Sequence, residues 1–192
     1  MNKYLPLYIK AFLYFTFGFG IPMNILLPTT LGFIFGYSWH GIVSEMGRTA
    51  FIIWAGSIAF GLLCSLGMVT IHILRVRSLP TRDAENVLSL IQIRSIRLPI
   101  SQETAFKTCI ASLMIVSAKV LEQENLLRIK AQTPFGGNNS LEQIEFNLTR
   151  INDSETHVTF TCRPKLKTTL VDFGASIDVA EKIYWYLEEK IK

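Results

Sequence analysis

Residues 51–77 read FIIWAGSIAFGLLCSLGMVTIHILRVR, an apolar run that is closed by two arginines. Asp, Glu, Lys and Arg are absent from 49–74 and again from 11–44. Each stretch exceeds the roughly 20 apolar residues that cross a hydrocarbon core about 30 Å thick. The sequence therefore predicts a membrane helical hairpin at the N-terminal end of the chain. We place this transmembrane region in 1–77, with spans at about 11–37 and 50–74.

The first apolar stretch is less regular than the second. Pro22 and Pro28 interrupt it, and a proline inside a helix removes a hydrogen bond and bends the axis. We expect one kinked or tilted span. The alternative is an interfacial helix over Tyr4–Phe17 followed by a crossing over Ile21–Tyr37. A cleaved signal peptide is not favoured, because the apolar sequence continues well past the small residues at Gly18–Gly20.

The distribution of charge predicts the orientation. Basic residues gather at the outer ends of the hairpin, namely Lys3, Lys10, Arg75, Arg77 and Arg82. The expected loop at 38–48 carries one Arg against one Glu. By the positive-inside rule, both termini are expected on the cytoplasmic side of the inner membrane. From Ser78 onward there are 14 basic and 14 acidic residues, and this balance argues against nucleic acid as a partner, because a nucleic-acid-binding domain carries a basic patch.

A short polar connector, 78–92, is expected to lead into a cytoplasmic α+β domain over 93–192. Apolar residues alternate through Ile96–Ile100, which predicts a first strand, and Pro99 places that strand at the edge of a sheet. Ser101 is typical of a helix cap. The helix that follows is expected to end near Ala118 and to carry one apolar stripe, formed by Phe106, Cys109, Ile110, Leu113 and Met114.

The rest of the domain has mainly the period of two that is typical of strands. After a strand start at Val120, the inward residues are Leu127, Ile129 and Ala131, then Ile144, Phe146 and Leu148, then Val158, Phe160 and Cys162. A closing helix is expected from about Ser176. The predicted order is β-α-β-β-β-β-α, an antiparallel sheet with two helices on one face. This layout resembles small helix-grip or TBP-like modules, in which a curved sheet wraps a long helix and sometimes leaves a cavity.

Residues 163–174 read RPKLKTTLVDFG and join the last strand to the last helix. One interpretation is functional: a phosphate or an acidic lipid headgroup is held before the helix N-terminus by Lys165, Lys167, Thr168, Thr169 and Gly174. The other is structural, and we favour it. In that interpretation Gly174 makes a tight turn, Asp172 or Ser176 caps the helix, and the lysines are solvated.

The stretch over 164–174 resembles the end of an uncharacterised group of bacterial membrane-anchored proteins. In that group a small α+β domain closes on a P-K-L-x-T-T-L-x-D-x-G stretch. The resemblance covers roughly the last half of this chain and implies no catalytic residues. Where the group has a loop that contains tryptophan, this chain has 133–140, TPFGGNNS. We interpret its Gly136 and Gly137 as a hairpin turn rather than as the cover of a pocket.

Patterns typical of catalysis or of metal binding are not found in the sequence. The three histidines are expected in a loop, at the end of a span and on a strand, at His40, His72 and His157 respectively. The cysteines have no metal-ligand spacing and are expected to be buried free thiols: Cys64, Cys109 and Cys162. Four glutamates are interpreted as solvated surface groups: Glu122, Glu124, Glu142 and Glu145. We expect no catalytic residue, no metal ion and no cofactor, and an enzyme is the least favoured class.

Small residues recur at helical spacing in both predicted spans, at Gly32 and Gly36 and at Ser57 and Gly61. They are expected to pack the two spans together, with the joining of copies into a homo-oligomer as the alternative. Two functions remain. The first is a membrane-tethered, non-enzymatic module that binds a protein partner or helps to assemble a complex among membrane lipids. The second is the binding of a lipid or other apolar ligand in a cavity between the sheet and the C-terminal helix.

Overall fold

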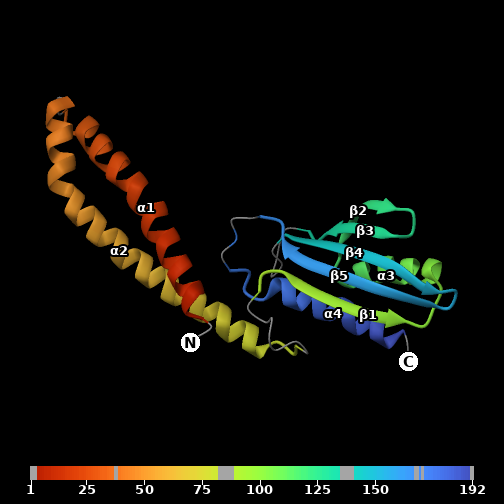
Figure 1. Ribbon diagram of the computed structural model, residues 1–192. Coiled ribbons are helices and arrows are strands. Elements are labelled where there is room, and N and C mark those ends of the chain that lie inside the picture. The colour runs from red at the N-terminus through yellow and green to blue at the C-terminus, as the bar shows by residue number, and fades with distance from the viewer. Residues whose placement is uncertain are drawn as a thin grey trace. The chain divides into compact units, whose positions relative to one another are not determined.

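The computed structural model describes residues 4–36, 39–81, 89–134, 141–166, 169 and 171–190 (Figure 1). By packing, the chain divides into two compact units, Met1–Ile71 and His72–Lys192. Several predictions lie outside the described residues: Tyr37 at the end of the first span, most of the connector at 82–88, Gly136 and Gly137, and Lys167 and Thr168 of the anion site.

Two long helices precede the domain, α1 (Leu5–Ile34) and α2 (Trp39–Ser78). Two stretches are long and apolar enough to cross a membrane, α1 itself and Ala50–Ser78 within α2. Both prolines lie inside α1, so the chain is helical through both of them. Next to Pro28, the Thr29 hydroxyl donates a hydrogen bond to the Ile25 carbonyl (2.6 Å). Such side-chain bonds help a helix to tolerate a proline in an apolar environment.

The predicted loop over 38–48 is wrong, because α2 already begins at Trp39. His40 therefore lies on a helix and not in a loop. The prediction took the charged residues that end the apolar run as the end of the helix as well. Charge marks where a membrane surface would lie, but it does not interrupt the backbone hydrogen bonds of a helix, and each added residue extends a helix at little cost.

Five strands and two helices follow α2. They are β1 (Gln92–Leu98), α3 (Gln102–Ile115), β2 (Lys119–Glu124), β3 (Arg128–Gln132), β4 (Glu142–Asn152), β5 (Glu155–Pro164) and α4 (Ala175–Glu189). The strands form one sheet in the order β1-β5-β4-β3-β2, with antiparallel neighbours throughout. The predicted α+β class with an antiparallel sheet is confirmed, and β1 is an edge strand. The resemblance to helix-grip or TBP-like modules stays a prediction.

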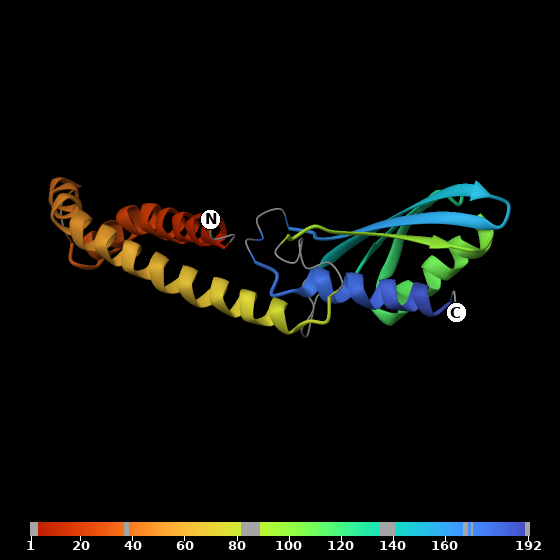
Figure 2. The ribbon, with the colours of Figure 1, turned by 60° about the horizontal axis from the view of Figure 1, so that its bottom comes forward.

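Helices α3 and α4 lie on the same face of the sheet (Figure 2). Between them and the sheet is one apolar core, to which β4 and β5 contribute Phe146 and Phe160 as partners in register. Their rings lie 5.3 Å apart between centroids. Leu113 of α3 and Ile183 of α4 are buried against this core. Side chains thus occupy the space between the sheet and the C-terminal helix, where the sequence placed a ligand cavity.

The interpretation of Glu142 as a solvated group is wrong, because this side chain is fully buried at the start of β4. Its Oε2 accepts a hydrogen bond from the Ser176 hydroxyl (2.6 Å). The inward positions of β4 alternate from Glu142 onward, so its place on the inner face follows from the strand and not from its polarity. Glu122 fits the prediction, since it is exposed and pairs with Lys130.

Candidate functional site

The turn before α4 is built around the buried carboxylate of Asp172. Its Oδ1 accepts a hydrogen bond from the Gly174 N–H (3.0 Å) and its Oδ2 accepts one from the Ser176 N–H (3.1 Å). A carboxylate at this position satisfies free backbone donors and interacts favourably with the helix dipole. Gly174 has a φ of +80°, a left-handed conformation that glycine adopts without strain. Asp172 therefore caps α4, as the structural interpretation of this segment predicts.

The same cap uses backbone donors that the anion-site interpretation needs. The N–H groups of Gly174 and Ser176 already bind a carboxylate, and its negative charge repels an approaching phosphate. Of the other residues predicted for the anion site, Lys165 is exposed and its backbone N–H donates to the Leu141 carbonyl (2.8 Å). The Thr169 N–H donates to the Leu166 carbonyl (3.1 Å). The described part of the segment thus forms a turn and a helix cap.

The last turns of α2 pack against Gly174. A Cβ atom added to Gly174 would lie 2.8 Å from Leu79 Cδ1 and 3.3 Å from Val76 Cγ2. Glycine is required here both by its φ and by this close approach. Val76 is fully buried, whereas Arg75 and Arg77 on either side of it are exposed. One side of the end of α2 therefore belongs, by packing, to the α+β unit.

His72, one turn earlier in α2, faces the same segment. Its ring makes an edge contact with the ring of Phe173, with centroids 6.4 Å apart. Its Nδ1 lies 3.7 Å from Asp172 Oδ1, and the side chain is almost completely buried. The spacing of His72, Val76 and Leu79 is the spacing of one helix face. The stretch Asp172–Gly174 therefore packs against this face of α2 and also caps α4.

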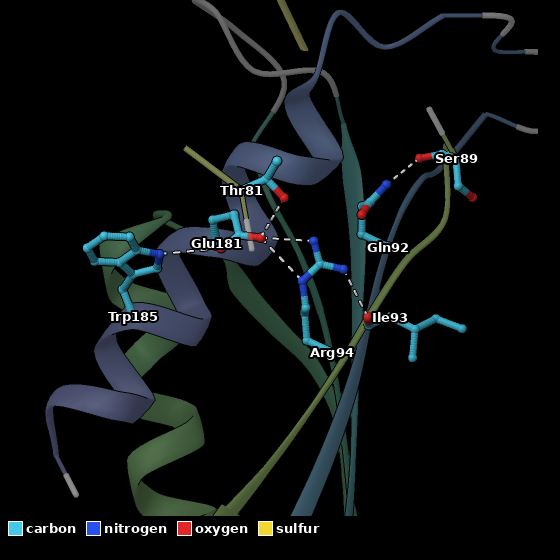
Figure 3. Close-up of polar contacts among 7 residues, drawn as sticks. All are labelled: Thr81, Ser89, Gln92, Ile93, Arg94, Glu181 and Trp185. Atoms are coloured by element: carbon cyan, nitrogen blue, oxygen red, sulfur yellow. Dashed lines mark hydrogen bonds and ion pairs between the residues drawn. The ribbon is translucent and has the colours of Figure 1, made fainter. Parts of the chain in front are cut away.

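Glu181 of α4 is the centre of a buried polar network (Figure 3). Its Oε1 accepts hydrogen bonds from Arg94 Nη2 (2.9 Å) and Nε (3.3 Å) on β1, and from the Thr81 hydroxyl (3.2 Å). Its Oε2 accepts one from Trp185 Nε1 (3.3 Å). The Arg94 and Glu181 side chains are 8% and 7% exposed. The network joins β1, α4 and the segment after α2, and it includes the indole of Trp185.

A groove of about 600 Å³ runs along α4. Its walls are Leu79 and Pro80, which follow α2, and Ile115 at the end of α3. The remaining lining comes from one side of α4: Ile177, Asp178, Glu181, Lys182, Trp185, Tyr186, Glu188 and Glu189. Its size is in the range typical of ligand sites. No strand residue lines it in the described part of the chain, so it does not lie between the sheet and α4, where the sequence placed a cavity.

The groove is acidic. Four of its lining residues carry carboxylates and one is a lysine. Lys182 pairs with Asp178 at 2.6 Å, and Glu181 is paired with Arg94. Glu188 and Glu189 lie in the last turn of α4, where the helix dipole disfavours negative charge. Lys190 at the C-cap supplies the cation that this helix end prefers.

In the unit Met1–Ile71, small residues lie where α1 and α2 touch. A Cβ atom added to Gly61 would overlap the Thr16 hydroxyl and lie 3.1 Å from the Thr16 nitrogen, and one added to Gly20 would lie 3.0 Å from Ser57 Oγ. The structure therefore places the predicted packing residues Ser57 and Gly61 at this contact. Gly36, by contrast, has nothing within 4 Å of an added Cβ and a φ of +66°. It follows the end of α1 and does not pack the two helices, whereas Gly32 is buried.

The described residues contain no group of three or more His, Cys, Asp and Glu side chains placed to hold a metal ion. Cys109 and Cys162 are buried free thiols, as predicted, and Cys64 is partly exposed. Burial raises the pKa of the Cys109 thiol to about 12 and that of Cys162 further. Neither thiol forms the reactive thiolate at neutral pH.

Sequence reasoning missed Arg94, Glu181 and Trp185. Trp185 and Arg94 each had a signal in the sequence. Tyr184, Trp185 and Tyr186 are consecutive, and because neighbouring helical residues are about 100° apart, three aromatic rings cannot all face one core. Arg94 stands two residues before the apolar alternation that begins at Ile96, and it is therefore on the inward side of the same strand.

The fold and the groove define the class of the protein: an α+β domain joined to two apolar helices, with an acidic groove along its last helix. No protein-family model matches the chain, and no curated protein is significantly similar to it. Its function therefore has to be inferred from its own residues.

Proposed function

We propose that this protein is a membrane-tethered, non-enzymatic binding module that holds a partner at the cytoplasmic face of the inner membrane. One observation carries the proposal. Leu79 and Pro80, which directly follow the candidate span Ala50–Ser78, form one wall of the groove on α4. The binding surface thus begins where the apolar helix ends.

Insertion into a membrane is supported by the exposed side chains of α1 and α2. Large apolar residues such as Ile25, Phe51 and Leu63 lie on the helix surface, where water disfavours them and lipid does not. The part of α2 from Ala50 to Ile71 is about 33 Å long. This length covers a hydrocarbon core, so the residues from His72 onward are available to pack against the domain.

The orientation is supported by Arg75 and Arg77, which are exposed at the end of α2. Basic residues that flank a span favour the cytoplasmic side. The connector at 78–92 is short, so the domain stays near the headgroups.

A binding role is supported over catalysis by the state of the polar groups at the groove. The Glu181 carboxylate accepts hydrogen bonds from Arg94, Thr81 and Trp185. The Asp178 carboxylate forms an ion pair with Lys182. A general acid or base has to exchange a proton with a substrate, and a carboxylate held in these contacts is poorly suited to do so.

The test uses the full-length chain. Membrane fractions are washed at alkaline pH, and a reporter fused after Lys192 gives the side on which the domain lies. We expect the protein to stay in the membrane pellet and the reporter to be active only inside the cell. Recovery of the protein in the supernatant without detergent would overturn the tether, and an active external reporter would overturn the orientation.

Binding is tested by photo-crosslinking in intact cells from position 186, with position 121 on the exposed strand β2 as the matched control. We expect one stoichiometric adduct from position 186 and none from position 121. Adducts of equal yield from both positions would contradict a specific binding surface.

A second candidate function is the binding of a lipid or other apolar ligand. The apolar wall and floor of the groove, Leu79, Ile115 and Ile177, favour it. The full-length protein is purified in detergent, and its extract is analysed by mass spectrometry. A lipid at one copy per chain, lost in Trp185→Ala but kept in the control Leu121→Ala, would support this function. Lipid recovered equally from both variants would contradict it.

A further inference from the structure

We infer that His72 is a proton-sensitive latch that holds the end of α2 against the turn before α4. With a neutral imidazole the latch is closed, and protonation of the ring opens it. The contacts involved lie within the unit His72–Lys192. The inference goes beyond the proposed function and does not depend on it, because no partner takes part in these contacts.

The ring of His72 is buried without hydrogen bonds. The side chain is 2% exposed, and within the described part of the chain neither Nδ1 nor Nε2 has a hydrogen-bond partner. A neutral imidazole has one N–H group to satisfy, whereas an imidazolium has two and carries a positive charge. Burial without partners costs more free energy for the charged form than for the neutral form. The closed contact therefore favours the neutral ring.

Asp172 is the acidic group that faces this ring, and its oxygens are already in use. Asp172 Oδ1 lies 3.7 Å from His72 Nδ1, beyond the roughly 2.7–3.2 Å of a hydrogen bond between nitrogen and oxygen. The two carboxylate oxygens accept the N–H groups of Gly174 and Ser176, and the dipole of α4 stabilises their charge. An imidazolium would gain attraction from Asp172 without a hydrogen bond, and this attraction is smaller than the hydration that a charged ring loses on burial.

Other charged groups near the latch do not balance a proton on His72. Arg75 and Arg77 lie on the same helix and are exposed, where water and salt screen their charges. Glu142 of β4 reaches the turn before α4, but its carboxylate accepts a hydrogen bond from the Ser176 hydroxyl. Among the described residues, Asp172 is thus the carboxylate that faces the ring.

The latch positions the residues that follow it. Val76 and Leu79 lie on the same face as His72 and pack against Gly174. Leu79 also lines the groove on α4, and the Thr81 hydroxyl donates a hydrogen bond to the buried polar network. Release of His72 therefore loosens the contact that places one wall of the groove.

The pH range of the latch follows from its open state. An exposed imidazole has a pKa of about 6.5, so the open state binds a proton below this pH and the closed state does not. The closed state therefore has its full stability above about pH 6.5 and loses stability as the pH falls further. Between about pH 7.5 and about pH 5.5, the equilibrium constant for opening is expected to rise about tenfold.

Thiol labelling of the full-length protein in a nonionic detergent measures this opening. Val76→Cys places a thiol at a fully buried position. Ser78→Cys places one at an exposed position of the same helix and corrects for the pH dependence of the reaction. Both variants carry Cys64→Ser, and the reagent is a pyridyl disulfide that reacts at acidic pH. We expect the labelling rate at position 76, relative to position 78, to rise about tenfold between about pH 7.5 and about pH 5.5.

The variant that tests the ring is His72→Gln, which keeps a polar side chain but cannot be protonated. Its matched control is His157→Gln on β5. We expect the relative labelling rate at position 76 to be independent of pH with His72→Gln and to keep its tenfold rise with His157→Gln. A rise that persists with His72→Gln would overturn the inference, and so would a rate that does not change with pH in the parent protein.

Further labelling sites show whether the opening is local. Leu79→Cys repeats the measurement at a second position of the same contact, so the result does not rest on one variant. Cys109 and Cys162 are buried in the core and are expected to stay unlabelled throughout. Their labelling at low pH would mean that the whole unit unfolds, and this would contradict a latch. A rate at position 76 that falls with acid would show that an imidazolium pairs with Asp172 in the closed state, which also contradicts it.

The latch and the proposed function fail in different ways. A contact that does not respond to pH removes the latch and leaves the binding module intact, since the labelling experiment contains no partner. Loss of the protein from the membrane pellet removes the proposed function and leaves the latch, whose contacts lie within one unit.

Discussion

In the unit Met1–Ile71 the large apolar side chains lie on the surface, as Phe51 (81% exposed) and Leu63 (72% exposed) illustrate. In the unit His72–Lys192 the side chains of the same kind, such as Phe146 and Phe160, are fully buried. The second unit folds by removing apolar surface from water. The first leaves much of its apolar surface uncovered, and its helices are long and apolar enough to cross a membrane.

The helix α2 belongs to both units and changes its environment along its length. Leu74 is 61% exposed, whereas His72 and Val76 are buried in the α+β unit. An apolar residue in this helix is therefore either exposed on the helix surface or buried in the α+β unit. Three substitutions and one truncation test this difference between the two units.

The largest effect is expected from Arg94→Met. The change leaves Glu181 buried without its cation, and breaking a buried pair in this way typically costs about 3–5 kcal/mol. The α+β unit is expected to unfold at lower urea concentration, measured by labelling of Cys109 and Cys162 in a Cys64→Ser background. Both thiols are buried, and the raised pKa of Cys109 (about 12) keeps it neutral and unreactive in the folded state.

The matched double variant R94M/E181M removes both charges. It is expected to recover most of the lost stability, because no unpaired charge remains. A double variant as unstable as the single one would mean that packing of the arginine stem, and not its charge, stabilises the unit.

A truncation tests whether the end of α2 belongs to the domain. A fragment over 72–192 retains Val76, Leu79 and Thr81, whereas a fragment over 89–192 loses them. Burial of the two apolar side chains alone is expected to stabilise the longer fragment by about 3 kcal/mol. The free energies of unfolding are compared by urea denaturation, and equal values would place the boundary at the connector instead.

Gly174→Ala is expected to destabilise the α+β unit by about 2 kcal/mol, since a left-handed φ disfavours alanine and its Cβ would meet Leu79 Cδ1 at 2.8 Å. The same urea titration measures it. The double variant G174A/L79A separates the two causes, because it relieves the contact and keeps the backbone strain. If Gly174→Ala costs as much stability in the L79A background as in the wild-type protein, the whole effect is due to φ.

Gly61→Ala is expected to weaken the packing of α1 on α2 by about 1–3 kcal/mol, because its Cβ would overlap the Thr16 hydroxyl. Gly67→Ala in the same helix is the control, since an added Cβ there has nothing within 4 Å. Resistance to unfolding by SDS in mixed micelles is the measurement. Similar resistance in both variants would contradict a specific contact at Gly61.

The elements of the α+β unit were largely predictable, because their apolar periods are clear. The cap at Ser101 and the turn at Asn152–Ser154 follow from local chemistry, and both are present: Ser101 accepts from the Thr104 N–H (3.4 Å) and Asn152 accepts from the Ser154 N–H (2.9 Å). The first half of β1 was missed. Its inward positions are Gln92 and Arg94, and a test for alternating apolar residues does not recognise polar ones.

The candidate site was less accessible to sequence reasoning. One interpretation of Lys165 and Thr169 was an anion site, whereas Asp172 accepts hydrogen bonds from two N–H groups at this helix end, as the favoured structural interpretation predicts. The groove depends on Ile115, Leu79 and Trp185, which are far apart in the chain. Nothing in the local pattern of any one of them indicates the other two.

From the sequence alone follow the two apolar helices, the α+β class, the period of β3, β4 and β5 and the glycine at the turn before α4. These depend on local chemistry, which neighbouring residues decide. The tertiary structure decided that Glu142 and Glu181 are buried, that the end of α2 packs on Gly174, and that an acidic groove lies along α4. Each of these is a contact between residues distant in the chain, and the energy of burying a charge depends on the partner that the fold brings to it.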